Sequence, residues 1–414
     1  MDNSILERAL GLGGAVVTGW EERGGDVVVD ARPRAAAPRC PVCGRRCPAY
    51  DTLAPRLWRA PDLGLSRCFV RHAPARVECP EHGVRAARVP WARCAASRMT
   101  SAFEDQLAWC ATQMSKRAAA ELMRVSWRTV GSACGRVWDD MLAREGGSLL
   151  GGLRRIGVDE TSRTRGHRYI TVVVDHDAGR VVWCADGYGK AVLSRFLDEL
   201  GEEGCAALEV VTADGARWIA DMVAERCPNA ERVMDPFHVV KWATDALDGL
   251  RRQAWNALRR GPSADPAAAR EVKGSRFALL KNPGDLTARQ AGALASVRAA
   301  GGALWRGYLL KEGLRAVFRA ASADEARGLL DRWLSWACRC RIPEFVEVSR
   351  KVRRRRDAIV RAVGLGISNA RVEATNNKVK LAVRTAYGFR NVGNLLAMVM
   401  LRCSKLAPSL PGRG

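Results

Sequence analysis

No apolar run in this 414-residue chain comes near the length of a membrane-spanning helix, which needs about 20 predominantly apolar residues. The first residues, Met1 to Ser4, also lack the basic region and following apolar stretch that are typical of a signal peptide. These two absences argue against a membrane-spanning protein and against an exported one. We therefore expect the chain in the cytoplasm.

Acidic residues are scarce relative to basic ones. The chain has 44 Asp+Glu against 67 Lys+Arg, a formal net charge of +23, and a sequence pI of about 10.1. Such an excess of positive charge favours a polyanionic partner, and nucleic acid fits better than a membrane surface. With 48% hydrophobic residues, the chain is also long enough to form a sizeable core and two or more domains.

The 14 cysteines stand in a chain without an export signal, so close Cys pairs predict a metal site rather than disulfides. Residues 40–44 (CPVCG) and 79–83 (CPEHG) share one pattern: ligand, Pro, one residue, ligand, Gly. Together they predict a structural Zn²⁺ site in a module over residues 36–98. Its expected ligands are Cys40, Cys43, Cys79 and His82. Two unrelated turns are the alternative, and Cys47, Cys68 and Cys94 are further candidate ligands.

The pattern becomes helical from residue 99. Thr100 or Ser101 can cap a helix to about residue 111, residues 115–122 form a second helix, and Ser126 caps a third after a turn at 123–125. This arrangement favours a helix-turn-helix DNA-binding domain over residues 99–145. An ordinary helical hairpin is the alternative. The side chains expected in the major groove are Ser126, Trp127, Arg128 and Thr129.

After a glycine-rich linker, residues 155–160, 168–175 and 180–185 predict three strands. Asp159 stands where the first of them is expected to end. A carboxylate in an apolar run is costly to bury unless something, such as a metal ion, pairs with it. The alternative is a solvated carboxylate just past the strand.

The segment up to residue 245 continues with a helix at about 191–201, a strand before Asp214, a helix at 216–226 and a strand before Asp235. This order is typical of a ribonuclease-H-like mixed-sheet core, in which the first and fourth strands are neighbours. Asp159 and Asp214 would then lie side by side, and two close carboxylates repel unless a cation lies between them. His238 is interpreted as a catalytic-site residue that orients the scissile phosphate or a carboxylate. The alternative for His238 is a buried, hydrogen-bonded side chain.

The remainder of the chain predicts helices. Residues 246–361 form an all-helical insertion that contains a basic run, RKVRRRR, at 350–356. We interpret Arg353, Arg354, Arg355 and Arg356 as phosphate contacts, with a solvated helix face as the alternative. Residues 362–414 are expected to complete the core. On a helix over 368–380, Glu373, Asn377 and Lys380 share one face, with Glu373 as a third carboxylate for the metal site and the other two as DNA contacts.

Several motifs together resemble the ISL3 family of bacterial insertion-sequence transposases. They are the paired knuckles, the helix-turn-helix, GVDE at 157–160, TADG at 212–215, DPFH at 235–238, EATNNKVK at 373–380 and AYGFR at 386–390. The resemblance covers nearly the whole chain. It implies a DDE-type catalytic core whose acidic triad is Asp159, Asp214 and Glu373. The pair Asp235 and His238 resembles the Asp/Cys-x-x-His motif of related transposases. One departure is His82, where many relatives use Cys.

The expected fold is therefore multidomain α/β: an N-terminal segment (1–35), the zinc-binding module, the helix-turn-helix, the ribonuclease-H-like core (150–245 and 362–414) and its helical insertion. Three carboxylates suit two Mg²⁺ or Mn²⁺ ions about 4 Å apart. We expect Asp159 to bridge both ions, and Asp214 and Glu373 each to complete one site.

The expected partner is double-stranded DNA, both terminal inverted repeats and target. A homodimer or higher oligomer associated with the bacterial nucleoid would cleave and join it. Two alternatives stay open. One is a ribonuclease-H-like nuclease or resolvase that cuts without joining. The other is a domesticated transposase that acts as a DNA-binding regulator, although the three carboxylates in place argue against it.

Overall fold

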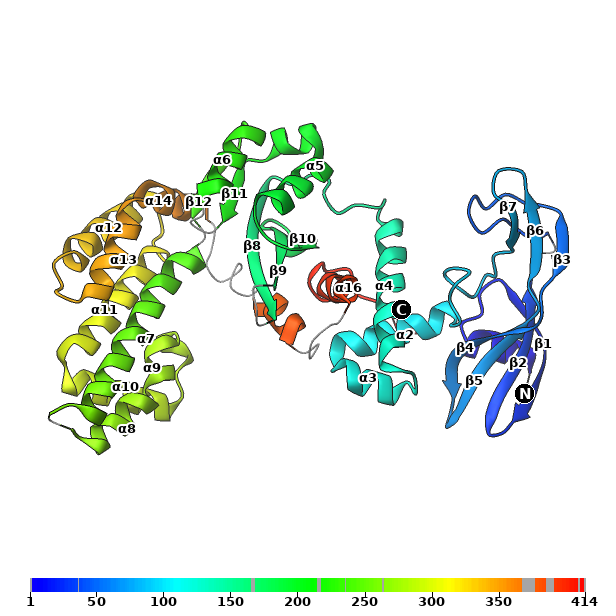
Figure 1. Cartoon of the computed structure of the whole chain (residues 1–414), viewed down its shortest axis with the longest axis horizontal. Coiled ribbons are helices and arrows are strands. Elements are labelled where there is room, and N and C mark those ends of the chain that lie inside the picture. Colours follow the sequence, from blue (N-terminus) through cyan, green and yellow to red (C-terminus); the bar gives the residue numbers. More distant parts are fainter. Residues whose placement is uncertain are drawn as a thin grey trace. The chain divides into compact units, whose positions relative to one another are not determined.

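The fold is taken from a computed structural model that describes residues 2–35, 37–164, 168–213, 217–234, 236–262, 264–366, 377–384, 391–408 and 410–412 (Figure 1). The chain forms two compact units. One contains Met1–Leu149, Arg163–Gly166 and Lys378–Gly414, and the other contains Leu150–Ser162 and His167–Asn377. The carboxy-terminal segment that we expected to complete the core is thus grouped mainly with the amino-terminal part of the chain.

The first unit begins with a four-stranded sheet of order β1-β2-β5-β4. Strands β2 and β5 are parallel neighbours in which Val29 lies opposite Val70. The expected boundary between residues 35 and 36 therefore runs through one hydrogen-bonded sheet. One face of the sheet is covered by an apolar cluster that includes Leu6 and Trp91. The elements are α1 (Asn3–Ala9), β1 (Ala15–Arg23), β2 (Asp26–Pro33), β4 (Arg56–Leu63) and β5 (Ser66–His72).

A second, three-stranded sheet carries the paired knuckles. It has the order β3-β6-β7, with β3 at Ala49–Thr52, β6 at Ala75–Cys79 and β7 at Gly83–Ala86. The second knuckle is the turn between β6 and β7, where Cys79 lies opposite Gly83. Gly83 has φ of +66°, and so does its counterpart Gly44 at +70°. Both knuckles thus end in the left-handed backbone that glycine adopts at little cost.

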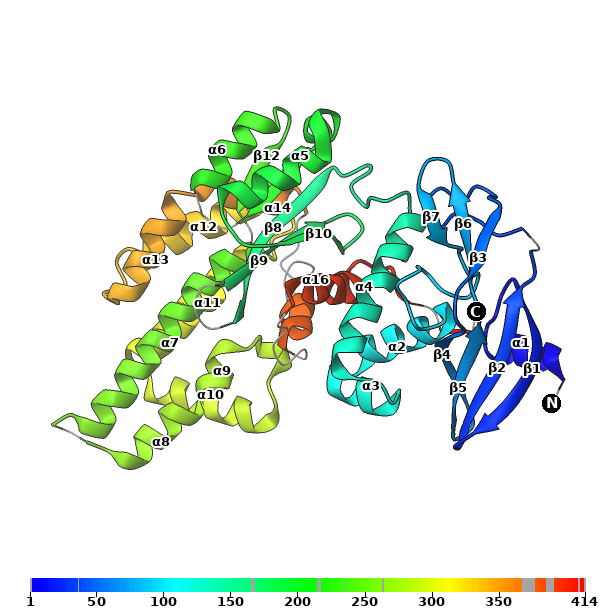
Figure 2. The same cartoon turned by 45° about the vertical axis from the view of Figure 1, so that its right-hand side comes forward.

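The predicted helix-turn-helix is formed by α2 (Ser101–Gln113), α3 (Lys116–Leu122) and α4 (Trp127–Arg144). Each helix begins where the sequence places a capping hydroxyl: Thr100 accepts from the Phe103 N–H, Ser115 from Ala118 and Ser126 from Thr129. The carboxy-terminal helix α16 (Val392–Cys403) packs against α4 and α2 (Figures 1 and 2). Arg402 ties α16 to the end of α2 by donating to the Ala111 carbonyl oxygen at 2.9 Å.

The second unit contains a five-stranded sheet of order β10-β9-β8-β11-β12. Strands β9 and β10 are antiparallel, whereas β8, β11 and β12 run parallel to one another. The expected neighbourhood of the first and fourth strands is confirmed, because β8 pairs with β11. The elements are β8 (Arg155–Thr164), β9 (Arg168–Asp175), β10 (Arg180–Asp186), α5 (Lys190–Ala207), β11 (Val210–Ala213), α6 (Arg217–Arg226) and β12 (Glu231–Met234). Helices α5 and α6 lie side by side (Figures 1 and 2).

The helical part of this unit is built along the long helix α7, against which α11 and α13 pack. Leu247, Leu310, Trp333 and Phe345 are buried in its apolar core. The expectation of an all-helical segment is confirmed for the described residues. The helices are α7 (Pro236–Arg260), α8 (Pro266–Gly274), α9 (Arg276–Leu280), the 3-10 turn η1 (Pro283–Asp285), α10 (Ala288–Ala300), α11 (Gly302–Val317), α12 (Ala323–Ala337), α13 (Pro343–Arg353) and α14 (Arg356–Gly364).

Within the described ranges, no helix combines the length and the apolar character that a membrane crossing requires.

Candidate active-site strand, metal cluster and DNA-binding helices

The two knuckles bring four potential metal ligands together. The Sγ atoms of Cys40, Cys43 and Cys79 and a ring nitrogen of His82 all lie within 4.8 Å of one another. Neighbouring donor atoms are separated by 3.5 to 3.8 Å. A tetrahedral zinc ion with Zn–S bonds of about 2.3 Å requires ligand–ligand edges of about 3.5–3.8 Å. The sequence-predicted ligand set is therefore assembled with the spacing that zinc needs.

The chemistry of the thiols agrees with this ligand set. Burial opposes ionisation of Cys79, but the Glu81 and His82 N–H groups favour the thiolate, and the net effect lowers the pKa of Cys79 to about 7. The further candidate ligands are poorly suited. Cys68 lies in β5, where burial raises its pKa to about 12. Cys94 is exposed, and the Cys47 thiol donates to the Arg45 carbonyl oxygen.

Asp159 lies inside β8 and not at its end, because the strand continues to Thr164. The expected end of the strand was therefore placed too early. The Asp159 side chain is only 12% exposed, and this low exposure argues against the alternative of a solvated carboxylate. Its Oδ2 atom accepts a hydrogen bond from the Thr161 hydroxyl at 3.2 Å, and its Oδ1 atom lies 3.7 Å from Nε2 of His238. The structure thus brings two of the predicted catalytic residues together.

His238 reaches this position because α7 begins at Pro236, immediately after the short strand β12 and one intervening residue. Its side chain is 21% exposed. Asp214, Asp235 and Glu373 lie outside the described residues.

The third helix of the helix-turn-helix presents polar residues at its start. Ser126, Trp127 and Arg128 are exposed, and Thr129 is half-buried. The Ser126 and Thr129 hydroxyl oxygens are 2.7 Å apart, so part of their hydrogen-bonding capacity is used within the cap. The ammonium of Lys116 lies 3.7 Å from the centre of the Trp127 ring and covers one of its faces. Arg128 is therefore the long cationic side chain that this helix end leaves projecting.

The turn before this helix is held against the first sheet. Arg124 adopts φ of +53°, which is unusual for a residue with a side chain. Its guanidinium pairs with Asp62 and donates to the Leu65 carbonyl oxygen at 2.9 Å. These contacts fix the turn to the end of the β4–β5 hairpin, so the orientation of α4 is coupled to the sheet.

Two family models match the chain. One, described as "Transposase", matches residues 156–399, which is more than half of the chain, and the other, described as "Helix-turn-helix domain of transposase family ISL3", matches residues 87–138. The chain belongs to the ISL3 family of transposases. The resemblance carried by the motifs is thereby confirmed, and so is the helix-turn-helix over an ordinary helical hairpin.

Individual transposases are also similar to this chain and support the family assignment. The transposase for insertion sequence element IS1557, from two strains of Mycobacterium tuberculosis, is 48% identical over 409 residues, which cover 94% of this chain and 91% of the relative. The transposase for insertion sequence element IS1001 from Bordetella parapertussis is 26% identical over 402 residues, which cover 94% of this chain and 96% of the relative.

In this ISL3 transposase, the basic run predicted to bind DNA is divided between two helices. Arg353 ends α13 and Arg356 begins α14, and of the four arginines at 353–356, Arg353 and Arg354 are the exposed ones. Arg356 makes two 2.7 Å hydrogen bonds to Asp331, and this bonding raises its pKa further above the usual range. Arg355 lies over the Trp242 ring at 5.4 Å. Arg353 and Arg354 are thus the members of the run best suited to contact phosphate.

The other two predicted DNA contacts fall in a short helical stretch over residues 377–384. Asn377 is exposed and Lys380 is half-buried.

A buried pair beside β8 was not predicted from the sequence. The Nε2 atom of His176 lies 2.6 Å from the Thr212 hydroxyl, which joins the start of the β9–β10 turn to β11. Gly157 on β8 leaves room for the pair, since a Cβ there would lie 2.8 Å from His176 Nε2 and 2.9 Å from Thr212 Oγ1. The glycine of GVDE could have indicated a close approach at this position, but the sequence does not show which residues approach it.

Proposed function

We propose that this transposase binds the terminal inverted repeats of a bacterial insertion sequence and catalyses DNA strand cleavage and strand transfer with a ribonuclease-H-like core, in which Asp159, Asp214 and Glu373 hold two Mg²⁺ or Mn²⁺ ions. The position of Asp159 carries the proposal. A carboxylate that is largely withdrawn from water within a sheet is costly unless it is paired with a cation or a donor. In the DDE mechanism, a metal ion bound by Asp159 would be that cation.

The strand order supports the assignment of the second carboxylate. In the parallel pair of β8 and β11, Thr212 lies opposite Gly157, and β11 is described to Ala213. Asp214 follows Ala213 in the sequence, and consecutive Cα atoms are about 3.8 Å apart. This adjacency to the end of β11 supports the proposal of Asp214 as the second carboxylate. Glu373 is proposed on the family resemblance alone.

The donor set fits the proposed ions. Mg²⁺ and Mn²⁺ prefer oxygen ligands, and Mg²⁺ is held by few carboxylates together with substrate oxygens. When bound, the ions supply charge stabilisation at the phosphodiester that water, and then a 3′-hydroxyl, attacks. The Thr161 hydroxyl holds one oxygen of Asp159 and leaves Oδ1 on the side of His238. We assign His238 to orienting the scissile phosphate or this carboxylate.

Recognition of DNA is proposed for three features. The start of α4, with Ser126, Trp127, Arg128 and Thr129, would read base edges of the terminal inverted repeats. Arg353 and Arg354, with Asn377 and Lys380, would contact the backbone of repeat or target DNA. A structural Zn²⁺ on Cys40, Cys43, Cys79 and His82 would hold the two knuckles together. We propose that the protein acts on DNA at the nucleoid as a homodimer or higher oligomer.

The substitution Asp159→Asn tests the active-site assignment. It should abolish strand cleavage and strand joining on a duplex that carries the terminal repeats, yet leave the gel shift of the same duplex unchanged. Asp198→Asn is the matched control, because Asp198 is an exposed carboxylate on α5 that pairs with Arg226. Cleavage near the wild-type level by Asp159→Asn would overturn the assignment. Wild-type cleavage without any joined product would instead indicate a nuclease.

A further inference from the structure

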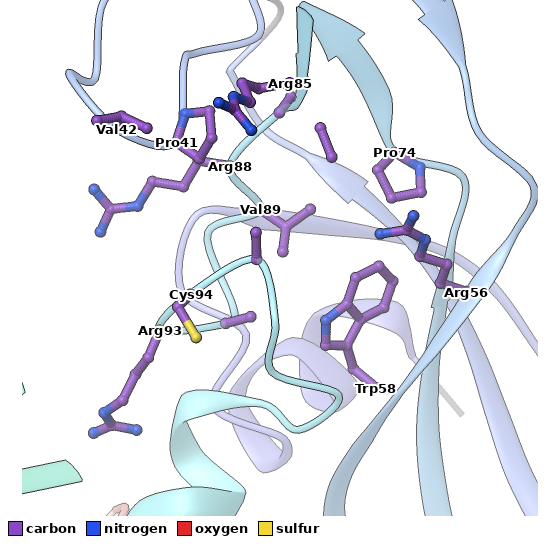
Figure 3. Close-up of a pocket in the computed structure, with 14 residues that line it drawn as sticks. Pro41, Val42, Arg56, Trp58, Pro74, Arg85, Arg88, Val89, Arg93 and Cys94 are labelled. Atoms are coloured by element: carbon purple, nitrogen blue, oxygen red, sulfur yellow. The ribbon is translucent and has the colours of Figure 1, made fainter. Parts of the chain in front are cut away.

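A cavity of about 560 Å³ lies in the first unit, next to the first knuckle (Figure 3). Its walls come from four separate segments: Pro41 and Val42 of the knuckle, Arg56 and Trp58 of β4, Pro74 after β5, and residues between Arg85 and Ala95 that lead toward α2. In Figure 3, Arg56 stands on the side of Pro74, and Arg85 and Arg88 stand on the side of Pro41. The cavity is thus formed by the fold and not by one flexible loop.

Several arginines of the same unit are neutralised by carboxylates of the protein. Arg34, Arg67, Arg71 and Arg76 each form an ion pair with a carboxylate. None of the described residues that line the cavity is acidic.

The lining arginines differ in how far the protein neutralises them. Arg93 points its guanidinium to Glu104, Asp105 and Asp140, so it contributes little charge to the cavity. Arg85 uses one N–H for the His82 carbonyl oxygen. Arg56 and Arg88 have no ion pair with any carboxylate of the described residues. The cavity therefore concentrates positive charge that the protein itself does not neutralise.

The rest of the lining is apolar. Trp58, Pro74, Val89 and Ala92 are among the lining residues, and Figure 3 shows Trp58 along one wall. Cavities of about 300–1,000 Å³ are typical of sites for small organic ligands, and inorganic phosphate would leave these apolar walls uncovered. The lining fits a ligand that is anionic at one end and flat and apolar at the other.

We propose that this cavity receives one unpaired nucleotide of a DNA strand, with its phosphate on Arg56, Arg85 and Arg88 and its base against the apolar wall. Proteins commonly hold unpaired bases between aromatic and apolar side chains while cationic side chains follow the backbone. A stacked duplex cannot enter such a cavity. The inference rests on the proposed function in that the partner is DNA, and it adds that one strand is unpaired beside the knuckle.

Cys94 makes the site measurable, because its exposed thiol is part of the wall. The full, zinc-loaded chain is treated with N-ethylmaleimide, and labelling of Cys94 is followed by mass spectrometry. The probes are a ten-nucleotide oligothymidylate, the same strand paired with its complement, and inorganic phosphate. Oligothymidylate should slow the labelling. The duplex and phosphate at the same concentration of phosphate groups should not.

Variants locate the protection. The double substitution Arg56→Ala and Arg88→Ala should raise the concentration of oligothymidylate that gives half-protection by roughly tenfold or more, because it removes two cationic partners of the phosphate. Arg23→Ala is the control, since Arg23 is an exposed arginine at the end of β1 in the same unit and does not line the cavity. Ala95→Trp narrows the cavity without changing its charge and should also abolish protection while zinc content stays normal.

Three outcomes overturn the proposal: equal protection by phosphate, equal protection by the duplex, or loss of protection in Arg23→Ala as large as in the double variant. The Asp159→Asn protein separates this inference from the proposed function. In this variant, oligothymidylate should slow the labelling of Cys94 as it does in the wild type, even though the variant does not cleave DNA. Loss of cleavage by Asp159→Asn with unchanged protection therefore supports both proposals. Cleavage by the wild type without any protection of its Cys94 rejects only the cavity, and wild-type cleavage by Asp159→Asn with unchanged protection rejects only the active-site assignment.

Discussion

The imidazole Nε2 of His176 and the hydroxyl oxygen of Thr212 are 2.6 Å apart in the sheet interior. His176 also donates its backbone N–H to the Arg155 carbonyl oxygen on β8, and the Thr212 hydroxyl lies 3.4 Å from the Ile156 carbonyl oxygen. The pair therefore links the β9–β10 turn, β8 and β11 to one another, and its contacts on β8 lie three and four residues before Asp159. This link holds in register the two strands that are proposed to carry the first two carboxylates.

Thr212→Val should weaken both the fold and the reaction. The change leaves a buried imidazole without this partner, which costs about 1–3 kcal/mol of unfolding free energy. Urea unfolding and a cleavage assay measure the two effects. Thr171→Val is the matched control, because Thr171 is also buried and its hydroxyl donates to the Gly187 carbonyl oxygen, away from the β8–β11 pair. Equal losses of cleavage in the two variants would remove the special role of the His176 link.

Zinc should be present at about one ion per chain and should contribute to folding directly, as expected of a closed four-ligand site. Cys43→Ser should lose the metal and loosen the β3-β6-β7 sheet, whereas Cys94→Ser should keep both. Metal analysis by atomic emission, together with hydrogen exchange of residues 75–86, measures the two effects. A wild-type protein that is purified with zinc available and yet contains none would contradict this prediction.

Arg128 and the pair Arg353 and Arg354 should affect DNA binding in different ways. If Arg128 reads a base edge, Arg128→Ala should reduce discrimination between terminal-repeat and random DNA by about 1–3 kcal/mol. Arg353→Ala with Arg354→Ala should keep that discrimination and flatten the slope of log K against log salt by about 0.9 for each phosphate that is no longer neutralised. Titrations of both DNAs at several salt concentrations measure these effects. An equal loss of affinity for both DNAs in Arg128→Ala would show that Arg128 does not read bases.

The buried Lys311 should make the unfolding free energy of the helical part depend on pH. Its buried ammonium lies 2.6 Å from the Leu279 carbonyl oxygen and 2.6 Å from Glu312, and burial lowers its pKa from 10.5 to about 8. Between these two values the unfolded chain binds more protons than the folded chain, so the unfolding free energy rises with pH.

The measurement compares wild type with Lys311→Met by urea unfolding under reducing conditions from pH 7.5 to 10.5. The difference between them should shift in favour of the wild type by up to about 3 kcal/mol across this range. Lys281→Met is the control, since Lys281 is exposed and contacts Gln290. A difference that does not change with pH would show that Lys311 is not held at a depressed pKa.

The sequence by itself determined the features that depend on local spacing. The knuckles at 40–44 and 79–83 each place two ligands one tight turn apart, so the pattern alone predicted the cluster of Cys40, Cys43, Cys79 and His82 that the structure contains. The caps at Thr100, Ser115 and Ser126 likewise satisfy N–H groups only three residues away. Alternation of apolar residues predicted the strands of the second unit for a similar reason.

Only the tertiary structure decided which distant residues meet. It pairs β2 with β5, packs α16 on α4, and joins His176 to Thr212 and Arg356 to Asp331. It also gathers Arg56, Arg85 and Arg88 around one cavity from segments that the sequence keeps apart. These contacts bridge long stretches of chain and depend on how whole sheets and helices pack. A periodic pattern determines which face of an element is apolar, but not which other element covers it.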